Sequence, residues 1–136
     1  MEKTSPSVAA DISPISLAFV GDAVFTLFVK SKLTLSHDCK PSELSRLANH
    51  YLSAAVQSKM YAAVLPQLSE DELAVAKRAR NAYKNVRAKN ASVGDYHRAT
   101  GLEGLLGWLY LSDMGERLEE LEEKCFEVGT AEMGTK

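Results

Sequence analysis

Two acidic residues stand in apolar stretches of the sequence where acids are not expected. Asp22 lies within Leu17–Phe25, and Glu103 lies within Leu102–Trp108. A carboxylate that is buried without a partner costs on the order of several kcal/mol, so it must be neutralised, paired or placed beside a cation. A divalent cation shared by the two acids would keep both ionised. The pair is therefore a candidate metal site.

Small residues surround both acids: Ala18, Gly21 and Ala23 near Asp22, and Thr100, Gly104 and Gly107 near Glu103. Small side chains let two helices approach closely, which would bring both carboxylates to one ion. Oxygen ligands favour Mg²⁺ or Mn²⁺ over zinc. We therefore expect Asp22 and Glu103 to hold Mg²⁺, with Mn²⁺ able to replace it. The alternative, that each acid pairs with an arginine or caps a helix, stays open at this point.

The remaining metal-binding residue types form no convincing site. His37, Asp38 and Cys39 are adjacent, but neighbours on a short loop rarely converge on one ion, and the chain has no second ligand cluster at zinc-site spacing. Cys39 and Cys125 show no CxxC spacing, so we expect two free thiols.

A basic segment, residues 77–98, sits on an otherwise acidic chain. It carries a net charge of +6, which leaves −8 for the rest of the protein. Asparagines and a tyrosine are interleaved with the charges, as suits hydrogen bonds to phosphate and sugar. A solvated helix face is the other explanation of such a run. The candidate nucleic-acid-binding residues are Lys77, Arg78, Arg80, Asn81, Lys84, Arg87 and Lys89.

Helix signals dominate the chain. Ser13-Pro14 predicts a helix start, and the residues that follow, to about Leu35, are apolar nearly all round, which is typical of a central buried helix. Further helices are predicted to start at Pro41, to span Ser53–Leu65, and to run from a capping box at Ser69 to about Tyr83. A loop is predicted over Lys84–Ala91. It is followed by a helix that includes residues 102–111 and by a last helix that ends at about Val128.

The fold class expected is therefore all-α, with one domain of about six or seven helices over residues 1–136. We expect an ordered core over about 13–129 and flexible ends. The apolar run Ile15–Val29 is interrupted by Asp22 and is too short to span a bilayer. With no targeting pattern at Met1–Ala10, we expect a cytoplasmic protein without a membrane anchor.

The stretches around the two acids resemble a known family. Phe19-Val20-Gly21-Asp22-Ala23-Val24 resembles the signature helix of the ribonuclease III family, Glu-x-x-Glu-[apolar]-[apolar]-Gly-Asp. Leu102-Glu103-Gly104-Leu105-Leu106-Gly107 resembles the second acidic helix of that family, Asp-x-x-Glu-Ala-Leu-[apolar]-Gly. The two motifs occur in the expected order, and the resemblance extends from about Ile15 to Gly129.

Two departures from the family pattern narrow the resemblance. The family has an acid four residues before Asp22, where this chain has Ala18, and an acid three residues before Glu103, where it has Thr100. The chain also has no room for a double-stranded-RNA-binding domain. These features match the Mini-III branch, which consists of a bare catalytic domain with a reduced acidic set.

The resemblance implies a magnesium-dependent endoribonuclease that cuts double-stranded RNA and leaves a 5′-phosphate, with Asp22 and Glu103 as its catalytic residues. It further implies a homodimer, precursor ribosomal RNA of the large subunit as substrate, and a ribosomal protein as a candidate partner. Without a separate RNA-binding domain, the basic residues named above would hold the duplex. Apolar surface beside Phe25 and Trp108 would form the dimer contact.

Two other functions remain open from the sequence. The first is a non-catalytic module of the same fold that binds structured RNA or a ribosomal protein, and it predicts binding without cleavage. The second is a small dimerisation or regulatory protein whose acids form structural ion pairs, and it predicts no RNA binding.

Overall fold

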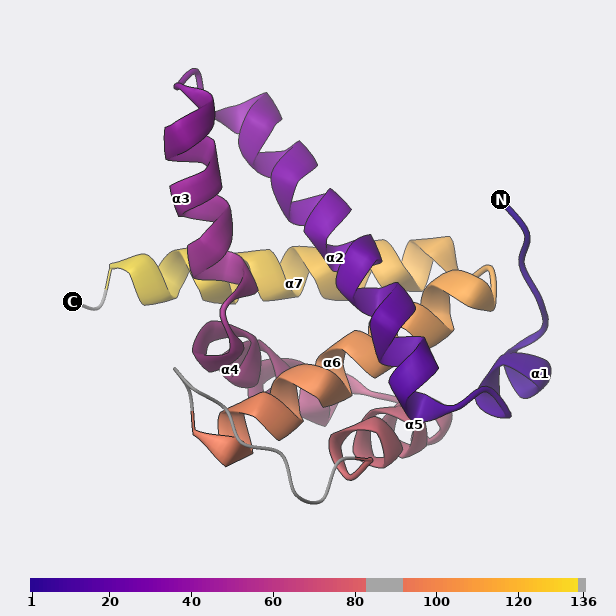
Figure 1. The fold of residues 1–136 in the computed structure, drawn as a ribbon. Coiled ribbons are helices and arrows are strands. Elements are labelled where there is room, and N and C mark those ends of the chain that lie inside the picture. Colours follow the sequence, from indigo (N-terminus) through magenta and orange to yellow (C-terminus); the bar gives the residue numbers. More distant parts are fainter. Residues whose placement is uncertain (83–91, 135–136) are drawn as a thin grey trace.

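The structure, a computed structural model, describes residues 1–82 and 92–134. The described residues form seven α-helices and one 3₁₀ helix and contain no strand, which confirms the all-α fold (Figure 1). The helices are α1 (Pro6–Ala10), α2 (Pro14–Ser36), α3 (Pro41–Leu52), α4 (Ala54–Val64), η1 (Leu65–Gln67), α5 (Glu70–Arg80), α6 (Val93–Leu111) and α7 (Gly115–Met133).

Helix starts follow the local signals in the sequence. Pro14 and Pro41 open α2 and α3. The capping box at α5 is present: the Glu72 backbone N–H donates to Ser69 Oγ, and the Ser69 N–H donates to the Glu72 carboxylate. Ser92 caps α6 by accepting from the Asp95 backbone N–H at 3.0 Å. These signals are local, so the sequence alone locates them.

The helical structure extends past the expected ends of the core. α7 continues beyond Val128 to Met133 because its last turns are held from α3 and α4. His50 Nε2 lies 2.7 Å from the Gly129 carbonyl oxygen, and Tyr51 Oη lies 2.7 Å from Thr130 Oγ1. The helix expected to reach about Tyr83 instead ends at Arg80. The loop expected over Lys84–Ala91 lies outside the described residues.

At the other end, α1 is held against the rest of the domain. Trp108 Nε1 donates to the Pro6 carbonyl oxygen at 3.0 Å, and the Thr4 N–H donates to the Leu111 carbonyl oxygen at 2.7 Å. Arg78 Nη2 donates to the Ala10 carbonyl oxygen at 2.5 Å. The N-terminal residues are therefore attached to the carboxyl end of α6 and to α5.

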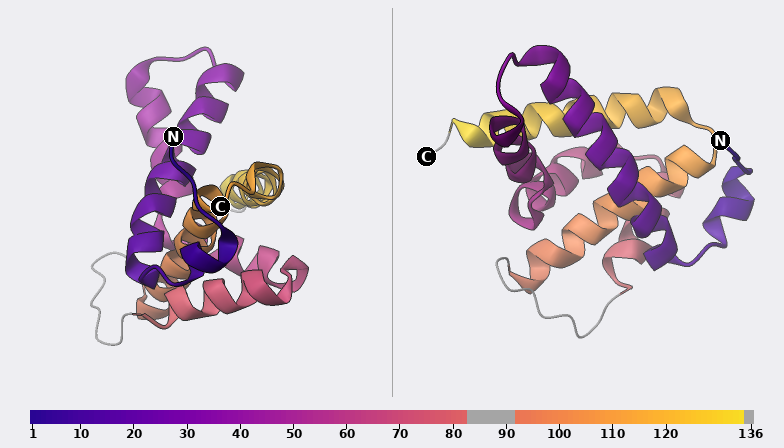
Figure 2. Two further views of the ribbon diagram at one scale, coloured as in Figure 1. Left: turned by 90° about the vertical axis from the view of Figure 1, so that its right-hand side faces the viewer. Right: turned by 45° about the horizontal axis from the view of Figure 1, so that its top comes forward.

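The helix at the centre of the domain is α6, not α2 (Figures 1 and 2). α2, α4 and α5 all pack on α6, and α7 crosses beside them. The distal half of α2 and α3 form a hairpin that stands out from the rest of the domain. Ten residues of α6 are buried, among them Gly101, Gly104 and Gly107. The packing of α2, α4 and α5 on α6 brings Glu103 of α6 close to residues of other helices.

The prediction that α2 is buried all round was wrong. Apart from Ala18, its buried residues repeat every four positions, as on one helix face: Leu17, Gly21, Phe25, Val29 and Leu33. The opposite face is apolar and exposed, with Phe19 80%, Leu27 69% and Leu35 90% accessible. Phe25 and Trp108, expected beside the dimer surface, are themselves buried in the core.

The length of α2 also corrects the sequence argument about membranes. With 23 residues and a mean hydropathy of 1.4 in its most apolar window, α2 is long and apolar enough to cross a bilayer. Within the folded domain, 28% of that window is buried. Its buried face belongs to the common core with α6. We therefore treat α2 as a helix of the folded domain.

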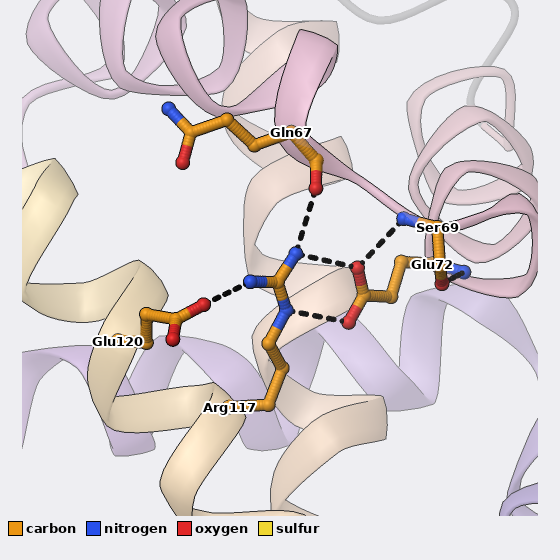
Figure 3. A network of polar contacts seen from close by, with 5 residues as sticks. All are labelled: Gln67, Ser69, Glu72, Arg117 and Glu120. Atoms are coloured by element: carbon orange, nitrogen blue, oxygen red, sulfur yellow. Dashed lines mark hydrogen bonds and ion pairs between the residues drawn. The ribbon is translucent and has the colours of Figure 1, made fainter.

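An arginine joins the start of α7 to α5 (Figure 3). Arg117 donates to both carboxylate oxygens of Glu72, at 2.8 Å and 2.9 Å, to the Gln67 carbonyl oxygen at 2.8 Å, and to Glu120. Since Glu72 is also the capping-box residue of α5, one buried carboxylate satisfies a helix end and an interhelical contact.

Candidate active site

The site forms where α2 crosses α6 at two glycines. A Cβ atom on Gly21 would lie 1.7 Å from the Glu103 carbonyl oxygen, and a Cβ on Gly107 would lie 1.9 Å from the Leu17 carbonyl oxygen. No larger residue fits at either position without moving a backbone. The expectation that small residues allow the two helices to approach closely is confirmed.

The crossing brings Asp22 and Glu103 into one pocket of about 280 Å³, lined by Ile15, Ala18, Phe19, Asp22, Tyr96, Thr100 and Glu103. Asp22 comes from α2 and Glu103 from α6. Their burial differs from the expectation, because Asp22 is exposed and only Glu103 is partly buried. The argument from a costly buried acid therefore applies to Glu103 alone.

The two carboxylates lie close enough to influence each other. Burial first, and then the neighbouring Asp22 carboxylate, raise the pKa of Glu103 to about 8. The Gln57 amide acts in the opposite direction and lowers this pKa. At neutral pH the pair therefore carries a proton, and a cation placed between the two oxygens could take its place.

Structural ion pairing does not account for the two acids. Among the ion pairs of the described residues, none includes Asp22 or Glu103. In the described part of the chain, neither acid is the N-cap of a helix. The alternative of an arginine pair or a helix cap is thus not supported by these residues.

The donor set fits a hard cation held by few protein ligands. Carboxylate oxygens are what Mg²⁺ and Mn²⁺ prefer, and Mg²⁺ keeps several waters in protein sites. Residues 1–82 and 92–134 contain no group of three or more His, Cys, Asp or Glu side chains that could hold a metal. Ala18 and Thr100, which replace the acids of the family pattern, line this same pocket. The protein thus offers two carboxylates, with water and substrate left to complete the coordination.

The structure adds two residues that sequence reasoning missed. Tyr96 lines the pocket one helical turn before Thr100, which donates from Oγ1 to the Tyr96 carbonyl oxygen at 3.0 Å. Gln57 approaches Glu103 from α4. The position of Tyr96 follows from helical spacing once Glu103 is chosen, whereas nothing in the sequence connects Gln57 with the site.

Some of the predicted RNA-binding residues lie within the described part of the chain and others do not. Lys77, Arg78 and Arg80 lie in the last turn of α5, and Asn81 follows it. This end of α5 packs on the turn of α6 that carries Glu103, since a Cβ on Gly104 would lie 2.4 Å from Ala79 Cβ. Lys84, Arg87 and Lys89 lie outside the described residues. Arg78 was expected to bind RNA, but its Nη2 group donates a hydrogen bond to the Ala10 carbonyl oxygen within the protein.

Comparison with known proteins matches most of the chain to one family. A model of the ribonuclease III domain matches residues 15–114. Mini-ribonuclease 3 of Brevibacillus brevis is 41% identical over 116 residues, 85% of this chain and 87% of that protein. Mini-ribonuclease 3 of Enterococcus faecalis is also 41% identical over 116 residues, 84% of this chain and 88% of that protein.

A solved structure supports the fold in the same way. The crystal structure of a Fusobacterium nucleatum protein superimposes with a TM-score of 0.78 at 27% identity, covering 86% of this chain and 93% of that one. The ribonuclease III family acts on double-stranded RNA and generally depends on a divalent metal. The resemblance noted in the sequence is thereby confirmed, and the chain belongs to the ribonuclease III family as an endoribonuclease of the Mini-ribonuclease 3 type.

Proposed function

We propose that this protein is a magnesium-dependent endoribonuclease that cuts double-stranded RNA, with Asp22 and Glu103 as the catalytic residues that hold the metal. The observation that carries the proposal is the meeting of the two carboxylates in one pocket at the Gly21–Gly107 crossing. Mn²⁺ should replace Mg²⁺, since both prefer oxygen ligands.

When bound, the metal supplies an activated water and stabilises charge on the scissile phosphate in an in-line displacement. Asp22 and Glu103 bind it in their ionised forms, so Glu103 gives up the proton that its raised pKa retains in the free protein. The exposure of Asp22 leaves one side of the pocket open toward RNA. The products carry a 5′-phosphate and a 3′-hydroxyl.

Duplex RNA is proposed to lie along the end of α5 beside the pocket. Lys77, Arg80 and Asn81 are the described contacts, and Arg78 joins them with whichever donors its bond to Ala10 leaves. Lys84, Arg87 and Lys89 follow directly in the chain. Recognition through phosphate and 2′-hydroxyl groups suits these side chains and needs no base reading.

We further propose a homodimer formed through the exposed apolar face of α2. Phe19, Leu27 and Leu35 are too exposed for a monomer surface that serves no contact. Phe19 also lines the pocket, so a partner that covers this face would border the site. Two sites across one duplex would allow each strand to be cut.

Precursor ribosomal RNA of the large subunit is proposed as the substrate on the family resemblance alone. No residue of the site selects this RNA over another duplex. The ribosomal protein named as a partner in the sequence analysis has no support in the site or in the comparisons.

The test is cleavage of a long RNA duplex with Mg²⁺ by the unaltered protein, by the same protein with a chelator, and by Asp22→Asn. We expect products only from the unaltered protein with free metal. If that protein binds both the duplex and a folded ribosomal precursor but cuts neither, the non-catalytic binding module replaces this proposal.

A further inference from the structure

A tyrosine shares the active-site pocket with the two carboxylates. Tyr96 lies near the start of α6 and lines the same pocket as Asp22 and Glu103. The residue is half-buried, and its ring meets the ring of His97 edge to face, with the two centroids 6.2 Å apart. A tyrosine in such a wall offers an apolar ring and a polar tip to a ligand. Tyr96 is therefore placed to contact the molecule that the pocket binds.

The register of α6 sets Tyr96 to one side of the carboxylates. Tyr96, Thr100 and Glu103 follow one another at steps of four and three residues, so they lie along one face of the helix. The step from Tyr96 to Glu103 corresponds to about 10 Å along the helix axis. An RNA strand whose scissile phosphate lies at Glu103 therefore passes Tyr96 at a nucleotide beside the cleaved one.

Tyr96 supplies a hydroxyl group to this wall of the pocket. Among the described residues that line the pocket, hydroxyl groups come from Tyr96 and Thr100, and the apolar lining residues are Ile15, Ala18 and Phe19. Thr100 Oγ1 donates its proton within the helix, to the Tyr96 carbonyl oxygen at 3.0 Å. The hydroxyl that suits a substrate contact on this wall is thus the phenol of Tyr96, which can both donate and accept.

A ribose hydroxyl suits this part of the pocket better than a phosphate does. A phosphate oxygen is negatively charged, and the charged groups among the described lining residues are the carboxylates of Asp22 and Glu103, with no lysine or arginine. The ribose 2′-hydroxyl is neutral and, like a phenol, both donates and accepts a hydrogen bond. It is also the group by which a protein distinguishes RNA from DNA at a given site.

We propose that Tyr96 is a specificity-determining residue: its hydroxyl forms a hydrogen bond with a ribose 2′-hydroxyl beside the scissile phosphate, so that the pocket selects RNA. The inference rests on the proposed binding of duplex RNA at this pocket. Because Tyr96 lies to one side of the two acids, its contact contributes to substrate binding and leaves the affinity for the metal unchanged.

The experiment compares two duplexes of one sequence, one made of RNA and one with fluorine in place of every 2′-hydroxyl. The fluorinated duplex keeps the A-form and the phosphates but has no ribose hydroxyl. The affinity of the full-length protein for each duplex is measured by fluorescence anisotropy with a chelator present, so that neither duplex is cut. The variant is Tyr96→Phe. Tyr110→Phe is the matched control, because Tyr110 lies on the same helix and outside the described lining of the pocket.

We expect the unaltered protein to bind RNA more tightly than the fluorinated duplex. Tyr96→Phe should bind RNA about two- to tenfold more weakly, as for the loss of one neutral hydrogen bond, and should bind the fluorinated duplex as the unaltered protein does. Tyr110→Phe should retain both affinities. A calorimetric titration with Mn²⁺ should give one affinity for Tyr96→Phe and the unaltered protein.

An equal loss on both duplexes in Tyr96→Phe would overturn the ribose contact, because a phosphate contact or a change in the fold weakens both alike. Unchanged RNA affinity in that variant would overturn it as well. If the unaltered protein binds neither duplex without metal, initial cleavage rates at limiting duplex with Mg²⁺ replace the affinities. If Tyr96→Phe does not fold, Tyr96→Leu, which also lacks the hydroxyl, takes its place under the same criteria.

The two proposals fail in different ways. A protein that binds both duplexes with the expected dependence on Tyr96, but cuts no RNA with Mg²⁺, contradicts the proposed cleavage and leaves the ribose contact standing. Cleavage that depends on Asp22, with equal affinities of the unaltered protein for the two duplexes, contradicts the ribose contact alone. A protein that neither binds nor cuts RNA contradicts both.

Discussion

Glu103 and Glu122 both have a pKa raised to about 8, but they differ in what surrounds them. Glu103 faces a second acid in a pocket. Glu122, on α7, owes its raised pKa first to burial and then to the charges of Glu119 and Glu123. Its Oε2 has no hydrogen-bond partner among the described residues. A raised pKa therefore does not by itself mark the site; the facing carboxylate does.

The buried position of Glu122 leads to a pH-dependent stability. Between pH 4.5 and about 8 the folded protein retains a proton on Glu122 that the unfolded chain releases, so stability falls as pH rises through this range. Glu122→Gln, neutral at every pH, removes that loss, which is on the order of 3 kcal/mol at pH 7. We expect equal melting temperatures near pH 4.5 and a higher one for the variant at pH 8.

The matched control is Glu127→Gln, which alters an exposed acid on the same helix. It should leave the difference between the two pH values as it is in the unaltered protein. A Glu122→Gln variant that melts with the unaltered protein at pH 8 would show that Glu122 ionises without cost.

The residue scale also shows where sequence reasoning succeeded. Asp22 and Glu103 were expected to meet, and the structure brings them into one pocket because each lies near a glycine of a close crossing. Asp22 was wrongly expected to be buried, because its apolar neighbours in sequence point to other sides of α2. Gln57 could not be found, since its relation to Glu103 exists only after α4 packs on α6.

At the scale of the elements, the α2–α6 crossing depends on the absence of a side chain. Gly21→Ala would place its Cβ 1.7 Å from the Glu103 carbonyl oxygen, so α2 must move away. We expect a loss of stability of about 3 kcal/mol or more and weaker Mn²⁺ binding, because the carboxylates separate. Urea unfolding and calorimetry measure the two effects.

Gly115→Ala is the control for the same substitution without a clash, because nothing lies within 4 Å of a Cβ at this position. It should stabilise the protein slightly, by about 0.4–1 kcal/mol, by restricting the unfolded chain. If Gly21→Ala behaves as Gly115→Ala does, the close approach of the two helices is not required.

The Arg117 contact joins α7 to α5 and predicts a second stability effect. Arg117→Ala leaves the buried Glu72 carboxylate with the Ser69 N–H alone, and breaking such a pair costs about 3 kcal/mol. Arg46→Ala, which breaks an exposed pair with Glu43, should leave the melting temperature almost unchanged. Equal melting temperatures for the two variants would contradict the structural importance of Arg117.

The same pair stabilises the protein only while Glu72 is ionised. Its hydrogen bond with Arg117 lowers the pKa of Glu72 below the ordinary 4.5. The stabilisation is therefore complete above pH 4.5 and is lost as the pH falls through the lowered pKa. Arg117→Ala and the unaltered protein should differ less in melting temperature at acid pH than at pH 7.

Element boundaries were predicted where local chemistry decides them. Prolines and serine caps located most helix starts, including the capping box of α5. The extension of α7 to Met133 was missed because it depends on contacts of Gly129 and Thr130 with α3. The one-sided burial of α2 was missed for the opposite reason, since the apolar residues on its outer face have no partner within the chain.

For the whole molecule, the exposed apolar face of α2 predicts that two copies of the protein associate. Leu27→Asp places a charge at the centre of the exposed stripe, so we expect it to convert a dimer into a folded monomer in sedimentation experiments. Val93→Asp changes an exposed apolar residue on α6 and should leave the mass unaltered. A monomeric unaltered protein at micromolar concentration would argue against the dimer.

RNA binding should depend on the charges at the end of α5. Replacing Lys77 and Arg80 by glutamine removes two charges that are proposed to contact phosphate, which we expect to weaken duplex binding and to reduce the slope of log affinity against log salt. Lys59 and Lys124, replaced in the same way, control for net charge. Equal salt slopes for the two double variants would remove α5 from the RNA contact.

The backbone contact at Gly21 and Gly107 has a consequence for how the enzyme fails on heating. Because two main chains set the spacing of the carboxylates, no local rearrangement can loosen the site while the two helices remain together. Loss of activity and loss of helix should then follow a single transition, without an inactive but still folded form at intermediate temperatures. The catalytic machinery would be as durable as the domain itself.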